Sequence, residues 1–115
     1  MGYMRHHAIV VTSWDRERLD EAHAEASRIF ADVTSIATGT AEGYQSFLIP
    51  PDGSKEGWRE SDEGDDRRHE FLAWLEIRRY DGDARLQWVE VQFGDDNGDD
   101  RIVQSSADVP EGTPD

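Results

Sequence analysis

One polar stretch of the chain, residues 51–65, has the residue types best suited to binding chemistry. It holds three glycines, and its tryptophan, Trp58, has no apolar neighbour in sequence. A plain linker does not need a tryptophan, and a buried element does not tolerate so many charged side chains. A segment of this kind, placed between a strand and a helix, is typical of a functional loop.

Basic side chains gather in and just after this loop and indicate an anion site. Four of the twelve basic residues lie here: Lys55, Arg59, Arg67 and Arg68. The start of the following helix would present free backbone N–H groups to an anion, and a tryptophan can stack on a base for about 1–3 kcal/mol. We therefore expect a small anionic, nucleotide-like ligand. The residues expected to bind it are Ser54, Lys55, Trp58, Arg59, Arg68 and Trp88. The alternative is that these cations form local ion pairs with carboxylates of the same segment.

The loop also matches the spacing of a calcium-binding loop. Positions 1, 3, 5, 6, 9 and 12 of such a loop would be Asp52, Ser54, Glu56, Gly57, Glu60 and Glu63. However, Arg59 stands at position 8, where an apolar residue is expected, and Lys55 adds a second positive charge. The segment before the loop ends in two prolines and does not predict a helix. We therefore expect no metal, and a calcium-binding module remains an alternative.

The chain lacks the common catalytic motifs. Its histidines, His6, His7, His23 and His69, have no helical zinc-site spacing, and neither a Walker loop nor a glycine-rich dinucleotide motif occurs. No Gly-x-Ser-x-Gly elbow is present, and the absence of cysteine excludes disulfides and thiolate chemistry. We predict a non-enzymatic protein without a cofactor, with a small hydrolase as an open alternative.

The net charge limits the class of partner. The sequence has 26 acidic and 12 basic residues, a formal charge of −14, which repels phosphate backbones and anionic membranes. No apolar run reaches the roughly 20 residues needed to span a bilayer. We expect a cytoplasmic protein that binds neither nucleic acid nor membrane directly. Acidic clusters at residues 60–66 and 95–100 suggest a second possibility, a nucleic-acid mimic that blocks a basic host protein.

Hydrophobic periodicity predicts alternating strands and helices. Residues 7–12 form an apolar, β-branched run typical of a buried strand. Ser13 or Asp15 can cap a following amphipathic helix that ends near Phe30. Residues 33–38 and 44–49 predict a hairpin, and a second helix is expected from Ser61 or Asp62 to Tyr80. Residues 86–93 alternate as a half-buried strand, with Val89, Val91 and Phe93 on one face and Trp88 on the other, outward face.

This order of elements predicts an α+β fold, a ferredoxin-like βαββαβ sandwich. It would have a four-stranded antiparallel sheet with two helices on one face. The outward face of the sheet could form a ligand wall or a homodimer contact through Trp88. Residues 1–94 would make up a single domain, and residues 95–115 an acidic turn and a flexible tail, in which residues 102–103 could add a short edge strand.

Three segments resemble small proteins encoded by phages and prophages of actinobacteria. They are the run from Pro51 to Trp58 with Ser61-Asp62 and Gly64-Asp65, the run from His7 to Trp14, and the run from Trp88 to Asp95. The resemblance covers about residues 6–96 and assigns no catalytic residue. It implies a viral accessory protein in the host cytoplasm, which would counter host defence by sequestering a signalling nucleotide or by blocking a defence complex.

Overall fold

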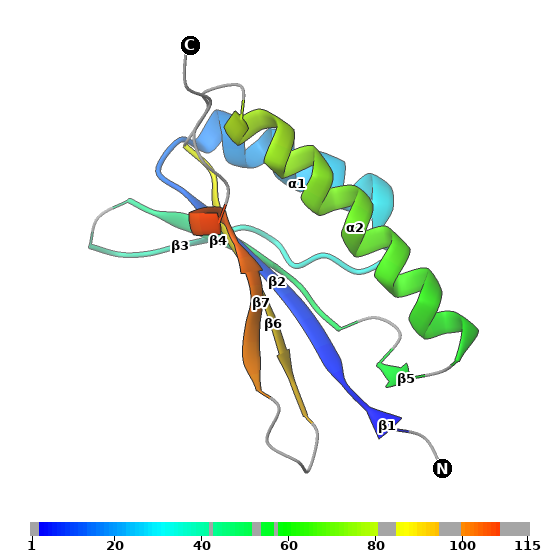
Figure 1. Ribbon diagram of the computed structural model, residues 1–115. Helices are drawn as coiled ribbons and strands as arrows, with labels where there is room; N and C mark the ends of the chain where they lie inside the picture. The colour runs from blue at the N-terminus through cyan, green and yellow to red at the C-terminus, as the bar shows by residue number, and fades with distance from the viewer. Residues whose placement is uncertain are drawn as a thin grey trace.

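The computed structural model describes residues 3–41, 43–51, 54–56, 58–80, 85–94 and 100–108. Within this part of the chain, two α-helices lie side by side on the same face of a five-stranded antiparallel sheet (Figure 1). The elements are β1 (Tyr3–Met4), β2 (His6–Ser13), α1 (Arg16–Ile29), β3 (Ala37–Thr38), β4 (Gln45–Ile49), β5 (Lys55–Glu56), α2 (Arg59–Tyr80), β6 (Gln87–Phe93), β7 (Arg101–Ser105) and the 3₁₀ turn η1 (Ser106–Asp108).

The predicted α+β class is confirmed, but the sheet has five described strands rather than four. Their order is β3-β4-β2-β6-β7, and every neighbouring pair is antiparallel. The expected hairpin is present as β3 and β4, although β3 has only two residues. A second, two-stranded sheet joins β1 to β5.

The extra strand lies in the segment predicted as turn and tail, and it includes residues 102–103, where a short edge strand was given as a possibility. β7 pairs with β6 along the edge of the sheet, and η1 follows it directly. Ser106 is buried, and its hydroxyl accepts a hydrogen bond from the backbone N–H of Trp88 at 3.2 Å. Residues 101–108 therefore pack as part of the domain. The predicted acidic turn at residues 95–99 and the tail at 109–115 lie outside the described residues.

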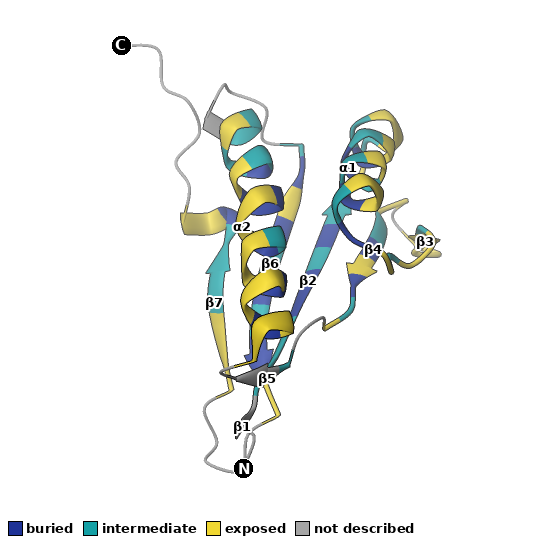
Figure 2. Cartoon of the chain, turned by 90° about the vertical axis from the view of Figure 1, so that its right-hand side faces the viewer, coloured by how far each residue is buried: buried dark blue, intermediate teal, exposed yellow. Residues whose placement is uncertain are grey.

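The hydrophobic core fills the space between the helices and the sheet, where the buried residues gather (Figure 2). Leu19, Ala22 and Ala26 recur along α1 at helical spacing and turn one stripe inward. From α2 the buried apolar residues are Phe71, Leu72 and Leu75. The sheet contributes Ile9, Val11, Phe47, Ile49 and Trp88.

The two faces of β6 are reversed relative to the prediction, and the outward placement of Trp88 is wrong. Trp88 is only 4% exposed and belongs to the core, and the alternating residues Glu90 and Gln92 also lie beneath the helices. Val91 and Phe93 point to the uncovered side of the sheet. The alternation was read correctly, but hydropathy places polar residues outside unless buried partners satisfy them. Such partners exist here.

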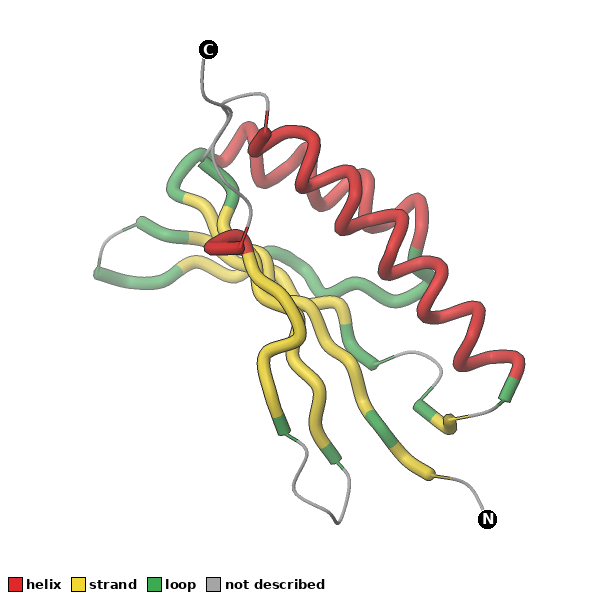
Figure 3. The backbone as a smooth tube through the Cα atoms, in the orientation of Figure 1, coloured by secondary structure: helices red, strands yellow, loops and turns green. Residues whose placement is uncertain are grey.

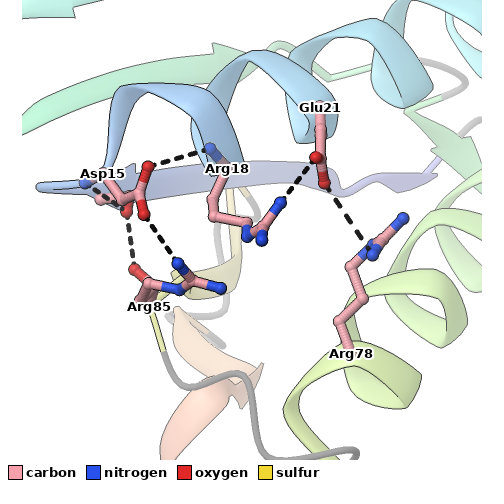
Figure 4. Close-up of polar contacts among 6 residues, drawn as sticks. Asp15, Arg18, Glu21, Arg78 and Arg85 are labelled. Atoms are coloured by element: carbon pink, nitrogen blue, oxygen red, sulfur yellow. Dashed lines mark hydrogen bonds and ion pairs between the residues drawn. The ribbon is translucent and has the colours of Figure 1, made fainter.

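A polar network joins the start of α1 to the chain before β6 (Figure 4). Asp15 caps α1 by accepting from the backbone N–H of Arg18 at 3.3 Å and also accepts from the guanidinium of Arg85 at 3.0 Å. Ser13 donates its hydroxyl proton to the carbonyl of Arg85 at 2.7 Å. Glu21 connects α1 to α2 through Arg78, with an oxygen-to-nitrogen distance of 3.9 Å. The predicted Asp15 cap thus also fixes how α1 meets the sheet.

Candidate functional site

The first part of the predicted functional loop is tied to the N-terminal strands (Figure 3). In the β1–β5 pair, Tyr3 lies opposite Glu56. The backbone N–H of Arg5 donates to the carbonyl of Ser54 at 2.8 Å, and the Ser54 hydroxyl shares a 2.7 Å hydrogen bond with Nδ1 of His6. Ser54 therefore has a structural partner. Residues 52, 53 and 57 and the side chain of the predicted ligand residue Lys55 lie outside the described part of the chain.

Trp58 stands at the start of α2, which begins two residues earlier than the earliest predicted start. Its carbonyl accepts from the backbone N–H groups of Ser61 at 3.0 Å and Asp62 at 3.2 Å. Its side chain is 52% exposed. Arg59 follows, also exposed, and forms a 3.1 Å ion pair with Glu63 one turn along the helix. At this position the local ion pairing that we gave as the alternative does occur.

Arg68 occupies a different side of the same helix and is buried. It lies nine residues after Arg59, which turns it roughly half a revolution around the axis at 3.6 residues per turn. Its guanidinium contacts Asp65 at 2.5 Å and approaches the carboxylate of Glu90 on β6 at 3.9 Å. Among the side chains that the structure describes, the predicted ligand residues Trp58, Arg59, Arg68 and Trp88 are therefore not brought together. Trp58 and Arg59 face solvent, whereas Arg68 and Trp88 face the sheet and the core.

Glu90 is the centre of a buried polar cluster beneath α2. Its Oε2 accepts from Nδ1 of His7 at 2.8 Å, and its Oε1 accepts from the side-chain amide of Gln104 at 3.1 Å. A β-bulge between Glu90 and Val91 shifts the register with β7, which turns Gln104 toward the helix side.

Burial by itself would raise the pKa of Glu90. The hydrogen bond from His7, the hydrogen bond from Gln104 and the electrostatic attraction of His7 and Arg68 outweigh it, so the pKa of Glu90 is lowered. The carboxylate is thus ionised at neutral pH and accepts from both neighbours. His7 must then carry a proton on Nδ1, because only that proton can make the hydrogen bond to an ionised carboxylate.

A pocket of about 250 Å³ opens beside this cluster, between α2 and the edge of the sheet. We call it the α2–β7 pocket, and its lining residues are Asp65, Arg68, His69, Leu72, Glu90, Val103 and Gln104. Two carboxylates face one guanidinium, so the lining has a net negative formal charge when His69 is neutral. Among the described residues, no group of three or more side chains is arranged to hold a metal ion.

Sequence reasoning found Arg68 but missed the other members of this site. His7, Glu90 and Gln104 are far apart in sequence, and the first two are separated by 83 positions. One signal was present in the sequence: Glu90 and Gln92 are two and four residues after Trp88, the largest apolar residue of β6, and therefore lie on the same face of the strand as Trp88. A tryptophan is most often buried, so its two polar companions could have been placed on the buried face with it.

Comparison of the chain with protein-family models, with curated proteins and with solved structures found no match in any of the three. Within the described ranges, neither α1 nor α2 combines the length and apolar character that a membrane span requires. The site must therefore be interpreted from its own geometry.

Proposed function

We propose that this is a non-enzymatic binding protein that holds a small polar ligand in the α2–β7 pocket. The observation that carries the proposal is the meeting of a buried, charged hydrogen-bonding cluster with an open cavity. A concave site with a few convergent polar groups and a perturbed pKa is the usual form of a ligand site. Leu72 and Val103 add the apolar surface that such sites provide.

The charges of the pocket favour a neutral ligand over the anion expected from sequence. Asp65 and Glu90 already offset the charge of Arg68, so a phosphate would meet no net positive field. The same residues offer both hydrogen-bond donors and acceptors, which suits a molecule with mixed polarity. At about 30 Å³ per water, the cavity holds roughly eight waters, which is about the size of a nucleobase. We therefore infer a nucleobase-like or nucleoside-like ligand, with any phosphate outside the pocket.

The environment of Glu90 suits binding better than general-base catalysis. Glu90 is held in its ionised form by its neighbours, whereas a general base at neutral pH works best with a pKa near 7. A lowered carboxylate pKa favours a fixed acceptor of hydrogen bonds.

The viral accessory role and the finer fold class are also proposals. The first is supported by the resemblance of residues 51–65 and of the two strand segments to proteins of actinobacterial phages. Sequestering a small host molecule inside the bacterium would fit that role.

The ferredoxin-like arrangement is supported by the strand order. In that fold the second, third, first and fourth strands of the chain lie side by side in this order, and β3, β4, β2 and β6 correspond to them. β7 would then be an addition at the edge.

Calorimetry against adenosine, guanosine, cytidine, uridine and their 5′-monophosphates tests the pocket. We expect at least one nucleoside to bind with a dissociation constant below about 1 mM and its monophosphate to bind no more tightly. Gln104→Leu should weaken that binding, because it removes a donor from the lining. Arg59→Ala is the control, because Arg59 lies on the opposite side of α2. Failure of all eight probes, or equal effects of the two substitutions, would refute the pocket proposal.

A second candidate, a blocker of a basic host protein, is favoured by exposed acidic residues in the first turns of α2. Glu60, Asp62 and Asp66 are exposed there and form no ion pair with any other described residue. Such a surface would bind a basic protein with strong salt dependence. Neutralising these three residues to amides should abolish capture of host proteins at about 50 mM salt, while the matched change of Glu17, Asp20 and Glu21 on α1 should not. Equal capture by both triple variants would argue against it.

A further inference from the structure

The face of the five-stranded sheet opposite the helices has a row of apolar side chains and no Asp, Glu, Lys or Arg from its strands. The pairing register also places the polar residues His6, Thr12, Ser46, Gln87 and Ser105 on this face. We call it the open face; Figure 1 shows both helices on the other side. Its apolar members span four strands: Leu48 on β4, Val10 on β2, Val89, Val91 and Phe93 on β6, and Ile102 on β7. The pairing register aligns them in cross-strand rows, with Leu48 beside Val10 and Val10 beside Val89, and with Val91 beside Ile102.

The missing charge is the informative feature. One third of all residues are charged, yet none of the residues that the five strands turn to this side is Asp, Glu, Lys or Arg. The β-bulge contributes, because it turns Ile102 to the open face while Gln104 turns to the helices. Leu48, Phe93 and Ile102 are each more than one third exposed. Contiguous exposed apolar surface of this kind marks an interaction site.

We propose that the occupant of the open face is a second copy of this chain, packed sheet against sheet about a two-fold axis. The distribution of charge indicates which face two copies could share. At −14 per chain, copies that approach through other surfaces bring carboxylates together and repel each other. An uncharged face meets its own copy without that repulsion, and a two-fold contact requires a self-complementary surface. Packed sheets lie about 10 Å apart with interleaved side chains, and the rows of valine, leucine and isoleucine suit that packing.

The size of the face sets the strength expected. Five strands about 4.8 Å apart and up to about seven residues long cover roughly 20 by 20 Å. This area is about half of the 800 Å² per partner that a standard interface buries. The dimer should therefore be weak and reversible, and not obligate. The inference is independent of the α2–β7 pocket, which lies on the other side of the sheet.

Two exposed isoleucines give a matched pair of variants. Ile102 on the open face is 63% exposed and Ile77 on α2 is 62% exposed, so Ile102→Glu and Ile77→Glu add the same charge at equal exposure. We expect sedimentation equilibrium of the full chain from about 1 to about 500 µM to show a wild-type dimer. Ile102→Glu should raise its dissociation constant at least tenfold, and Ile77→Glu should leave it unchanged. Leu48→Glu, at the other side of the face, should act like Ile102→Glu, and circular dichroism should show all three variants folded.

Three results would overturn the proposal. One is a wild-type monomer across the whole range, and the second is a dimer that survives both Ile102→Glu and Leu48→Glu. The third is a dimer lost equally in Ile77→Glu, because that residue lies outside the open face. If the wild type is a monomer, Ile102-dependent binding of an apolar fluorescent dye would show that the open face is exposed in solution and not covered by a second copy.

Discussion

Replacement of Glu90 by glutamine should destabilise the fold more than any exposed substitution of the same kind. The carboxylate accepts from His7 at 2.8 Å and from Gln104 at 3.1 Å. A glutamine has one acceptor oxygen and one donor group at its end, so it can keep only one of these hydrogen bonds. The other donor would then face an N–H group. Weakening one charged bond costs about 1 kcal/mol, and leaving a buried donor unsatisfied costs about 1–3 kcal/mol, so the free energy of unfolding should fall by about 2–4 kcal/mol.

The same substitution predicts a pH dependence of definite sign. Folding lowers the pKa of Glu90 below its ordinary value of 4.5. The stabilisation is therefore complete above the unfolded-state pKa and is lost as the pH falls through the lower folded-state pKa. Other carboxyl groups titrate in both the wild type and Glu90→Gln, so the difference between the two isolates the contribution of Glu90. The difference in unfolding free energy between wild type and Glu90→Gln should thus be larger at pH 7 than at about pH 3.5.

Urea unfolding measures this difference, followed by fluorescence of the buried Trp88 and the other tryptophans. Glu60→Gln is the control, because Glu60 is exposed and surface changes usually stay within about 0.5 kcal/mol. A Glu90→Gln effect as small as that of the control at pH 7 would refute the ionised cluster. So would an effect of equal size at both pH values, because it would then not depend on ionisation.

Three further substitutions test local features of the structure. Gly94→Ala should lower the free energy of unfolding by more than about 2 kcal/mol, since Gly94 has φ +101° and an added Cβ would lie 2.3 Å from the ring of His6. The control is Gly43→Ala, which has φ +77° and open space around it and should cost less in the same urea titration. Equal costs would contradict the close packing of Gly94 against His6. Asp15→Ala should lower the unfolding free energy by about 1–2 kcal/mol, because it removes the cap of α1 and the partner of Arg85. An unchanged melting curve by circular dichroism would show that the polar contacts of Asp15 do not stabilise the fold. Arg59→Ala should change the unfolding free energy by less than about 0.5 kcal/mol, because its pair with Glu63 is exposed, and a larger loss would reveal a role for Arg59 that its ion pair does not explain.

The local pattern of the sequence was sufficient for the two helices and for β2, β4 and β6, but not for β1, β5 or the face that β6 buries. The apolar run of β2, the stripe of α1 and its Asp15 cap depend on neighbouring residues, and the structure confirms them. The orientation of β6 depends on distant partners. Glu90 is buried because His7, Arg68 and Gln104 satisfy it, and the only local sign of this in the sequence is that Glu90 alternates in step with Trp88. β7 was underestimated because its two apolar residues are isolated in polar sequence and need β6 as a partner.

The candidate site was predicted only in part for a related reason. The cluster of basic residues around Trp58 is real in sequence, but a helix distributes its side chains around the axis. Arg59 and Arg68 therefore separate, one into solvent beside Glu63 and one beneath α2 beside Glu90. Counting residues along α2 predicts that separation once the helix is known to begin at Arg59. The pocket itself needs the sheet, because Glu90 and Gln104 form one of its walls.

Amide chemical-shift mapping with nucleosides tests most directly whether the α2–β7 pocket is the binding site. Titration of the isotopically labelled full chain with adenosine, guanosine, cytidine and uridine would follow every backbone amide at once. We predict that at least one nucleoside shifts the amides of His69, Val103 and Gln104 in a saturable way, while the amides of Trp58 and Arg59 remain in place. Saturable shifts centred on Trp58 and Arg59, or no saturable shift with any nucleoside, would contradict it.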